Sequence, residues 1–399
     1  MQQRKKILVI PSWYPNKEQT YGGSFFREQS EFFLQKYDVR VLVGSRSSLP
    51  LNKWCKKYGL GHASPSEVEV TQAGLQEHRF CYRTTFKDEK HLIGSMIQGY
   101  IETLKRMIGD GWKPDLIHAG CTDPAGIVAA SFSKTFTIPW VLSEHQVFAL
   151  GNYSPYRAKL MRRAIKSETM VTVVSQHQLR AFVAHYIYRS LIVTGNLVDE
   201  KKFQLVTSHS KKPVFNIMTV MYPSPIKDPE TFFKAIAEIA SIGHKNIEVT
   251  IIGKELFSRD NVDKFTRYIN QYKLETLCTV IPYVRNDELA EYYSKADVFV
   301  STSLAETFGI AVREAMMVGI PVVCTSSGGV DDDIFDFNGF RVDIYDYKAI
   351  ANAVIKIKEG TVRYDPTVIR NHVLTKYGRK AFLEKMSEIF EAALEKAEA

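Results

Sequence analysis

The 399-residue chain contains no run of about 18 or more apolar residues, so no transmembrane helix is predicted. Its five cysteines are scattered and include no Cys-x-x-Cys, which argues against a disulfide framework and a zinc knuckle. Gly59-x-Gly61 lacks both the third glycine and the preceding strand of a dinucleotide-binding fingerprint, which disfavours a dehydrogenase. The apolar run from Ile7 to Ser12 is too short for a signal-peptide core, so we expect a cytoplasmic protein.

The charge of the chain is distributed unevenly. Residues 1–200 contain 26 Lys and Arg against 17 Asp and Glu, whereas residues 201–399 contain 26 against 27. A basic first half is typical of a surface that faces a membrane, a nucleic acid or another polyanion, and equally of a basic surface that faces only water. The segment Lys53–Tyr58 mixes cations with aromatic rings, which suits either a membrane interface or a solvated loop.

Short β-branched runs alternate with helical patterns in both halves, which is typical of parallel sheets covered by helices on both faces. In the first half we predict strands at 6–11, 38–44, 115–119, 139–143, 170–174 and 191–194, and helices at 24–36, 91–109, 124–134, 155–167 and 176–186. In the second half we predict strands at 215–220, 247–252, 277–281, 297–301 and 320–324, and helices at 229–241, 260–272, 286–295, 308–318 and 347–357.

These patterns predict an α/β protein with two Rossmann-like, doubly wound parallel-sheet domains. The polar segment Thr207–Pro213 has no periodicity and is interpreted as the linker, so the domains are placed at 1–206 and 207–377. Residues 378–399 are predicted to form a helix that crosses back to the first domain, with one apolar face made by Phe382, Met386, Ile389, Phe390 and Leu394. Ligands of such sheets bind beyond the carboxyl ends of the strands, so the residues that follow each strand are candidate site residues.

The most informative segment is Ser301–Gly329, in which a strand ends, a helix begins near Phe308-Gly309 and a glycine, Gly319, stops the helix. The unpaired amide groups and the dipole at a helix start suit an anion such as phosphate. Glu306 precedes the helix and can bond sugar hydroxyls, and Glu314 can accept both hydrogen bonds of a ribose diol. Taken alone, Glu306 could instead cap the helix and Glu314 could be a solvated charge; the surrounding string favours the binding interpretation.

The string Ser303-Leu304-Ala305-Glu306-Thr307-Phe308-Gly309 is followed by Glu314-Ala315, by Gly319-Ile320-Pro321-Val322-Val323 and by Gly328-Gly329. This arrangement resembles the signature of the retaining glycosyltransferases of family 4, which have the GT-B architecture. The resemblance runs from residue 5 to residue 395 and is weakest at 45–110. Pro11-Ser12-Trp13-Tyr14-Pro15 resembles members that build bacterial surface polysaccharides. The resemblance implies that an N-terminal acceptor-binding domain and a C-terminal nucleotide-sugar-binding domain face each other across a cleft.

The resemblance also implies roles for individual residues. Glu306, His145 and Lys227 would be catalytic, with Glu306 on the donor sugar. The donor-binding residues would be Leu304, Thr307, Phe308, Gly309, Glu314, Gly22, Gly23, Tyr222, Lys254, Tyr283 and Val284. Within this set, the amides of 307–309 would hold the donor diphosphate and Glu314 the ribose. His145 follows Glu144 at a strand end and could otherwise be an ordinary surface histidine, whereas His118 is interpreted as a packed histidine.

The chain departs from the family pattern at Tyr222, which stands where the family has an arginine that pairs with the donor diphosphate. The second cation of the pattern is present as Lys227. Loss of a bidentate cation weakens phosphate binding unless another cation replaces it, and Lys254 and Arg285 are the candidates. Without replacement, we expect weak donor binding or impaired activity.

The resemblance implies an enzyme that transfers a sugar with retention from a nucleotide-sugar donor, UDP- or GDP-linked, to a saccharide or lipid-linked saccharide acceptor. No metal ion and no other cofactor is expected, and Asp331-Asp332-Asp333 is interpreted as a solvated loop. We expect peripheral contact with an anionic membrane and no nucleic-acid partner. The alternatives are a non-catalytic or weakly active GT-B protein that binds a polyanion or a membrane surface, and an epimerase or phosphorylase-like enzyme of the same fold.

Overall fold

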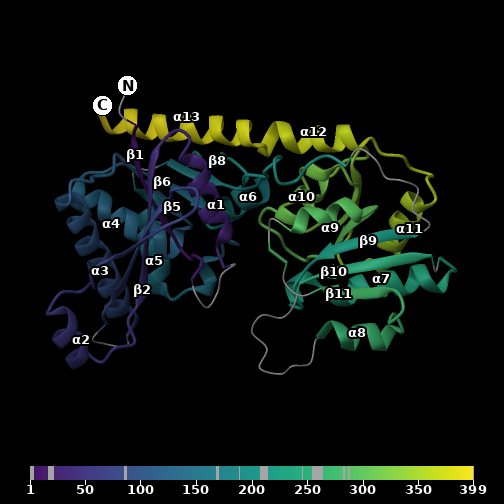
Figure 1. Ribbon diagram of the computed structural model, residues 1–399, viewed down its shortest axis with the longest axis horizontal. Helices are drawn as coiled ribbons and strands as arrows, with labels where there is room; N and C mark the ends of the chain where they lie inside the picture. The colour runs from purple at the N-terminus through teal and green to yellow at the C-terminus, as the bar shows by residue number, and fades with distance from the viewer. Residues whose placement is uncertain are drawn as a thin grey trace. The chain divides into compact units, whose positions relative to one another are not determined.

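The structure is a computed structural model that describes residues 4–16, 22–84, 88–167, 170–187, 189–206, 214–244, 246–253, 264–281, 284–285 and 288–398. The chain folds into two compact units, each described separately below. The first unit comprises Met1–Val173, Leu179–Thr194 and Leu383–Ala399, and the second unit comprises Val174–Gln178 and Gly195–Phe382. Both units are α/β, with helices on the two faces of a sheet (Figure 1).

Residues 195–206 belong to the second unit, whereas the division predicted at residue 206 placed them in the first. Backbone hydrogen bonds explain the difference. The Val198 amide donates to the Tyr377 carbonyl at 3.0 Å, and the Val206 amide donates to the Val318 carbonyl at 3.0 Å. The predicted linker, 207–213, lies outside the described residues.

The first unit contains an eight-stranded sheet of order β3-β4-β2-β1-β5-β6-β7-β8. The strands are β1 (Lys6–Pro11), β2 (Asp38–Arg46), β3 (Glu67–Val70), β4 (Gln76–Tyr82), β5 (Leu116–Gly120), β6 (Trp140–Glu144), β7 (Met170–Val173) and β8 (Ile192–Val193). Neighbouring strands are parallel except β3 and β4, which are antiparallel. Strand β1 is buried along its whole length after Lys6, as an apolar run covered on both faces should be.

Helices cover both faces of this sheet. They are α1 (Ser24–Phe33), α2 (Leu51–Tyr58), α3 (Glu89–Gly109), α4 (Ile127–Phe136), α5 (Pro155–Lys166) and α6 (Gln176–Ala184), with short helices η1 (Thr122–Gly126) and η2 (Leu150–Asn152). The main core packs residues of α3, α4 and α5 against the strands. The C-terminal helix α13 (Arg379–Glu398) contributes Phe390, whose ring lies 5.4 Å from that of Phe33 on α1.

The second unit contains a six-stranded, fully parallel sheet of order β11-β10-β9-β12-β13-β14. The strands are β9 (Phe215–Val220), β10 (Ile247–Ile252), β11 (Cys278–Ile281), β12 (Val298–Ser301), β13 (Val322–Thr325) and β14 (Gly339–Val342). The strand order reverses between β9 and β12. In open α/β sheets a ligand binds at the carboxyl ends of the strands beside such a reversal, so this point locates the candidate site.

Two hydrophobic clusters lie on the two faces of this second sheet. One cluster packs α9 (Leu289–Lys295), α10 (Ile310–Val318) and α12 (Pro366–Tyr377) against it. The other packs α7 (Pro229–Ser241), α8 (Lys264–Tyr272) and α11 (Tyr347–Lys358). Helix α10 ends at Gly319, whose φ of +97° is the left-handed conformation that stops helices, as predicted from the sequence.

The predicted α/β architecture with two doubly wound sheets is confirmed, and most predicted strands lie within a few residues of their predicted ranges. Four elements were not predicted from the sequence: α2, the β3–β4 hairpin, β14 and α12. The alternation Glu-Val-Glu-Val of strand β3 does fit a period of two, but the strand has only four residues and all four are exposed. The predicted apolar face of the C-terminal helix is confirmed, because Phe382, Met386, Ile389 and Phe390 are buried and Leu394 is half-buried.

Candidate active site

Two side chains meet where the strand order of the second sheet reverses. Lys227 follows β9 and Glu306 follows β12, and the Lys227 ammonium lies 2.6 Å from the Glu306 carboxylate. Both side chains are mostly buried, with 19% and 16% of their surface exposed. Glu306 therefore does not cap α10, which was the alternative role considered from the sequence. The two residues instead form a charged pair at the ligand-binding edge of the sheet.

The main chain around this pair is fixed by hydrogen bonds between the two strand ends. The Leu304 amide donates to the Ile226 carbonyl at 2.8 Å, and the Thr302 hydroxyl lies 3.0 Å from the Lys227 carbonyl oxygen. The Ser303 hydroxyl donates to the same Glu306 oxygen that Lys227 contacts, at 2.8 Å. Lys227 and Glu306 are thus held by their backbones as well as by each other.

The glycine pair after β13 packs directly on the Glu306 loop. The Glu306 amide donates to the Ser327 carbonyl at 2.8 Å, and the Gly329 amide donates to the Glu306 carbonyl at 2.9 Å. A Cβ atom on Gly329 would lie 2.4 Å from the carbonyl carbon of Thr307. Only glycine therefore allows the two loops to approach this closely.

Helix α10 begins immediately after these loops, at Gly309. Its φ is +69°, and a Cβ atom there would lie 2.3 Å from a methyl group of Val330. Among the described residues, no side chain caps this helix start. The first amides of a helix have no partner within it, so they can donate to an anion. Phe308 is buried, whereas the helix start itself adjoins Glu306.

Beneath the helix start lies Arg313, which is 1% exposed. Its guanidinium group stacks on the Phe308 ring at 4.0 Å, donates to the Gly329 carbonyl at 3.0 Å and forms an ion pair with Asp333. Arg313 therefore connects the start of α10 to the glycine pair after β13. Arg313 was not predicted as a site residue, because in the sequence a single charged residue within an apolar helix resembles a solvated charge.

Asp333 is also buried, so the prediction of a solvated Asp331–Asp333 loop is wrong for this residue. Besides Arg313, Asp333 accepts a hydrogen bond from Tyr377 at 2.8 Å on Oδ2. Its Oδ1 accepts one from Lys376 at 2.7 Å and lies 3.1 Å from His372. Burial alone would raise the pKa of Asp333, but hydrogen bonding to His372, the charge of Arg313 and the Lys376 contact hold it well below its usual range.

Glu314 lies one position after Arg313 on α10 and is 6% exposed, so the alternative of a solvated charge is excluded. Its carboxylate accepts a hydrogen bond of 3.0 Å from the Tyr293 hydroxyl. Burial and the Glu314 charge raise the pKa of Tyr293 well above its usual value, so the phenol remains a donor. Tyr293 was not predicted as a site residue, and nothing in its local sequence indicates this contact.

Several predicted donor-binding residues lie at the periphery of this arrangement or outside the described residues. Tyr222 is 51% exposed, and the Lys227 ammonium lies 5.7 Å from the centre of its ring. Val284 is half-buried against the cluster under α10. Arg285, a candidate replacement for the absent arginine, is paired with Glu288 at 2.8 Å. Lys254 and Tyr283 lie outside the described residues.

In the first unit, the strand order reverses between β1 and β5. The predicted residues Gly22, Gly23 and His145 lie on loops that follow strands of this sheet. His145 follows β6, and its ring lies 5.1 Å from that of Phe25 and 5.2 Å from that of Phe26. The buried Glu144 carboxylate accepts the amides of His145 and Gln146 at 3.0 and 2.9 Å. Glu144 therefore fixes the backbone of His145, a role that sequence reasoning had not assigned.

The remaining predicted residues of the first unit lie at the start of α1 and in the core. Gly23 caps α1 with φ +76°, and a Cβ atom on it would lie 2.6 Å from the Trp13 carbonyl oxygen; Gly22 precedes it. His118 is packed in the core, as expected, with Nε2 2.8 Å from the Ser143 hydroxyl. Burial and the nearby His145 lower the pKa of His118 to about 3.

Within the described ranges of the chain, no group of three or more His, Cys, Asp or Glu residues is arranged to hold a metal ion. Across the same ranges, no helix is long and apolar enough to span a membrane.

Two doubly wound sheets, with a charged pair and a helix start at a strand-order reversal, define a doubly wound α/β protein with a candidate ligand site at that reversal. Residues 34–202 match the family model described as Glycosyltransferase Family 4, and residues 198–381 match the one described as Glycosyl transferases group 1. Together the two models span 34–381. The chain belongs to the family 4 glycosyltransferases of GT-B fold, which confirms the resemblance read from the sequence.

Individual relatives agree with this assignment. The chain is 25% identical over 367 residues, 88% of each protein, to TuaC of Bacillus subtilis (strain 168), whose name assigns it to teichuronic acid biosynthesis. The solved sucrose-phosphate synthase of Thermosynechococcus elongatus has a TM-score of 0.72 and 18% identity, covering 98% of this chain and 99% of that one. Anabaena HepE, solved with UDP and glucose, has a TM-score of 0.72 and 17% identity, with 98% and 100% covered. At these identities the two structures show the shared fold.

Proposed function

We propose that this glycosyltransferase moves a sugar, with retained anomeric configuration and without a metal ion, from a UDP- or GDP-linked donor to a saccharide or lipid-linked saccharide in bacterial surface-polysaccharide synthesis. The observation that carries the proposal is the 2.6 Å contact between Lys227 and Glu306 beside the uncapped start of α10. A cation and free amides suit a diphosphate, and a carboxylate beside them suits sugar hydroxyls.

In this proposal the chain contributes mainly electrostatic stabilisation. The bond between the anomeric carbon and the diphosphate oxygen breaks while the acceptor hydroxyl attacks the same face of the sugar. The acceptor proton passes to the departing diphosphate oxygen. Charge grows on that oxygen, so Lys227 and the amides of 307–309 stabilise the transition state more than the bound donor. Glu306 orients the sugar, Glu314 binds the ribose, and His145 is retained as the third proposed catalytic residue.

The names and ligands of relatives support the donor and the pathway proposed here. The solved HepE structures contain UDP, or UDP with glucose, or UDP-glucose, so we test UDP-sugars first. TuaC, named for teichuronic acid biosynthesis, is similar over most of both chains, which favours a surface saccharide as the acceptor. The acceptor is assigned to the first unit.

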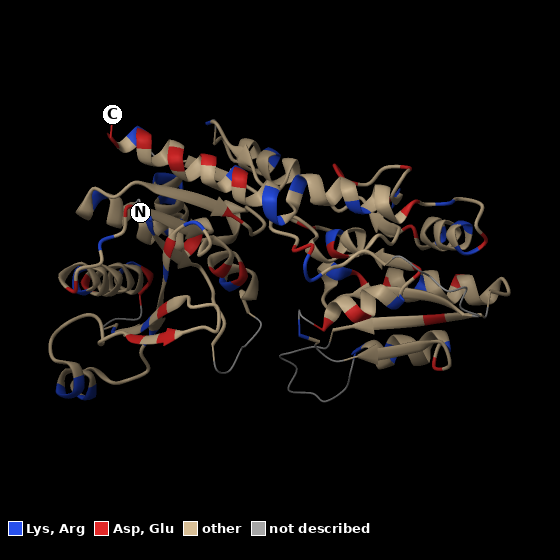
Figure 2. Cartoon of the chain, turned by 45° about the horizontal axis from the view of Figure 1, so that its top comes forward, with Lys and Arg blue, Asp and Glu red and all other residues tan. Residues whose placement is uncertain are grey.

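We also propose that the protein works in the cytoplasm, at the inner face of the membrane. Residues 1–200 carry an excess of cations, and Lys53, Lys56 and Lys57 gather on α2, where Figure 2 shows a group of blue residues. Cationic surfaces attract anionic lipid headgroups. Flotation of the protein with phosphatidylglycerol liposomes at low salt tests this location; an equal yield with phosphatidylcholine liposomes would contradict it.

The deciding experiment is nucleotide release from UDP-glucose, UDP-galactose, UDP-N-acetylglucosamine and GDP-mannose in the presence of bacterial membranes as the acceptor source, with and without EDTA. We expect one donor to be used equally well in EDTA. Glu306→Ala should then lower turnover by about 100-fold, while the matched variant Glu291→Ala, in an exposed pair with Lys295, leaves it unchanged. NMR of the product should show the donor's anomeric configuration. Inversion, or a requirement for metal, contradicts the corresponding part of the proposal.

The second candidate is a GT-B protein that binds donor or polyanion without significant catalysis. The observation that favours it is Tyr222, an exposed neutral side chain where the family has a cation. Binding of UDP with no turnover of any of the four donors would support this candidate. Turnover of any of them excludes it.

A further inference from the structure

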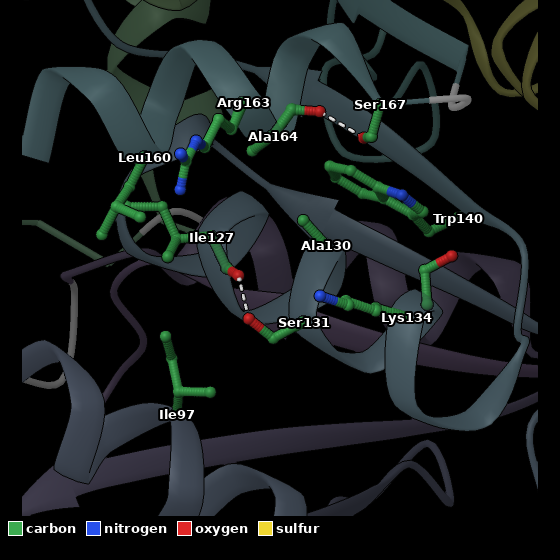
Figure 3. A pocket seen from close by; sticks show the side chains of 11 residues that line it. Ile97, Ile127, Ala130, Ser131, Lys134, Trp140, Leu160, Arg163, Ala164 and Ser167 are labelled. Carbon is green, nitrogen blue, oxygen red and sulfur yellow. Dashed lines mark hydrogen bonds between the residues drawn. The ribbon is translucent and has the colours of Figure 1, made fainter.

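A groove of about 460 Å³ lies in the first unit between α3, α4 and α5, over the beginning of β6 (Figure 3). Buried or half-buried apolar side chains form its floor and walls, among them Ile97, Ile127, Trp140 and Leu160. The volume is within the range of small-molecule sites. Nothing in the proposed sugar transfer uses this groove.

The lining residues select a class of ligand. They include Lys134, Arg163 and the hydroxyls of Ser131, Ser133 and Ser167, but no carboxylate and no side-chain amide. A cation would find no counter-charge here. A neutral sugar would lack the acidic and amide partners that its hydroxyls need. An anionic group attached to a hydrocarbon body matches both the cations and the apolar walls.

Neither Lys134 nor Arg163 forms an ion pair with the part of the chain that the structure describes, although both border an apolar groove. Both occupy the last turn of their helices, where a cation can stabilise terminal carbonyls. In Figure 3 neither side chain extends toward the end of its helix. Lys134 reaches back toward Ser131, and Arg163 extends on the Leu160 side, away from Ser167. Each charge therefore lies over the groove rather than over its own helix end.

The groove is also separate from the candidate residues of the first unit. Strand β6 begins at Trp140, which lines the groove, and ends at Glu144, after which His145 follows. The groove thus lies at the opposite edge of the sheet from His145. Helix α5, which forms one wall, carries five cations and no acidic residue, and Lys159, Arg163 and Lys166 are exposed. This charge draws an anionic partner to the groove.

We propose that the groove between α4 and α5 binds one anionic phospholipid, with its phosphate between Lys134 and Arg163 and an acyl chain along Ile97, Ile127 and Leu160. The inference goes beyond the proposed sugar transfer and does not depend on it. A bound lipid would place α5 at the membrane independently of the acceptor.

Calorimetric titration of the full chain tests the proposal, with dihexanoyl-phosphatidylglycerol below its micelle concentration as the probe. We expect one site per chain. Dihexanoyl-phosphatidylcholine, whose headgroup has no net charge, should bind at least tenfold more weakly. Glycerol phosphate, which lacks the chain, should also bind at least tenfold more weakly, and this arm separates a lipid site from a phosphate site.

Variants then locate the site. Lys134→Ala with Arg163→Ala should weaken phosphatidylglycerol binding at least tenfold, and Ala130→Phe should block it by filling the groove. The matched control, Lys105→Ala with Lys113→Ala, removes two exposed cations of the same unit outside the groove and should bind as the wild type does. Equal affinity for the two lipids, or wild-type affinity in the Lys134 and Arg163 variant, overturns the proposal. The lipid test measures binding and the sugar-transfer test measures turnover, so the lipid proposal can be tested even if no sugar transfer is observed.

Discussion

Lys227 and Glu306 lie 79 positions apart in the chain, yet their charged groups are 2.6 Å apart at the ends of two adjacent strands. In this arrangement the cation proposed to hold the donor diphosphate is already neutralised by the carboxylate proposed to hold the donor sugar. A diphosphate must therefore compete with Glu306 for Lys227. Binding and turnover should respond in opposite directions when this carboxylate loses its charge.

Glu306→Gln tests that opposition. Turnover should fall by about 100-fold, because the sugar loses its charged acceptor. The affinity for UDP should rise by about five- to tenfold, since Lys227 is released to pair with phosphate. Nucleotide release and calorimetry with UDP measure the two effects. Uridine, which has no phosphate, should bind both proteins equally; a rise in uridine affinity would attribute the change to reshaping of the site.

Tyr222→Arg should supply the cation that the family pattern has at this position. Tyr222 is half exposed beside Lys227, so an arginine can be accommodated there without disturbing the core. We expect UDP to bind about tenfold more tightly, since a charge-assisted contact to phosphate is added. Tyr222→Phe is the control and should bind UDP as the wild type does. An unchanged UDP affinity in the arginine variant would indicate that another cation already fills this role.

Asp333→Asn should destabilise the second unit by about 3 kcal/mol or more at pH 7, because it leaves the buried Arg313 without its counter-charge. Chemical denaturation followed by circular dichroism measures the loss. The neighbouring exposed residue provides the control, since Asp332→Asn should cost little. A wild-type stability for Asp333→Asn would show that this ion pair does not hold the two loops.

The same variant has a defined pH dependence. The pKa of Asp333 is lowered in the folded protein from its ordinary value of 3.8, so its stabilising contribution is fully present above that value. It is lost as the pH falls below 3.8 toward the lower folded value. The difference in unfolding free energy between wild type and Asp333→Asn should therefore be present at neutral pH and shrink below pH 3.8. If the stability difference between wild type and Asp333→Asn grew as the pH fell, the pKa of Asp333 would be raised rather than lowered by folding, and this interpretation would be wrong.

Gly329→Ala should weaken UDP binding by disturbing the candidate site. Its added methyl group would press on the Thr307 carbonyl carbon, which lies 2.4 Å away, and would displace the loop that leads into α10. We expect UDP affinity to fall at least tenfold. Gly94→Ala on α3 is the matched control, because nothing lies within 4 Å of the position of its Cβ atom. If both variants bound UDP equally well, the amides of 307–309 would not contact the diphosphate as proposed.

The sequence predicted features that depend on one residue type acting within its own segment, such as helix ends and strand ends. Gly319 stops a helix, and the strand ends before Lys227 and Glu306 follow from apolar runs. It was uninformative about partners brought together by tertiary packing. Asp333 resembles the exposed Asp332 until α12 supplies Lys376 and Tyr377. Glu144, likewise, gains its role only when the backbone of His145 turns toward it.

The division of the chain also governs how its parts can be exchanged between relatives. The first unit is assembled from three separate stretches, the last of which, Leu383–Ala399, follows the whole of the second unit. A chimera made by a single crossover at Thr194–Gly195 would therefore pair the start of the first unit with a foreign C-terminal helix. The Phe33–Phe390 packing would then have to be rebuilt between unrelated sequences. Grafting Gly195–Phe382 from a relative needs two crossovers, one at Thr194–Gly195 and one at Phe382–Leu383, and it leaves the short stretch Val174–Gln178 of the second unit from the recipient.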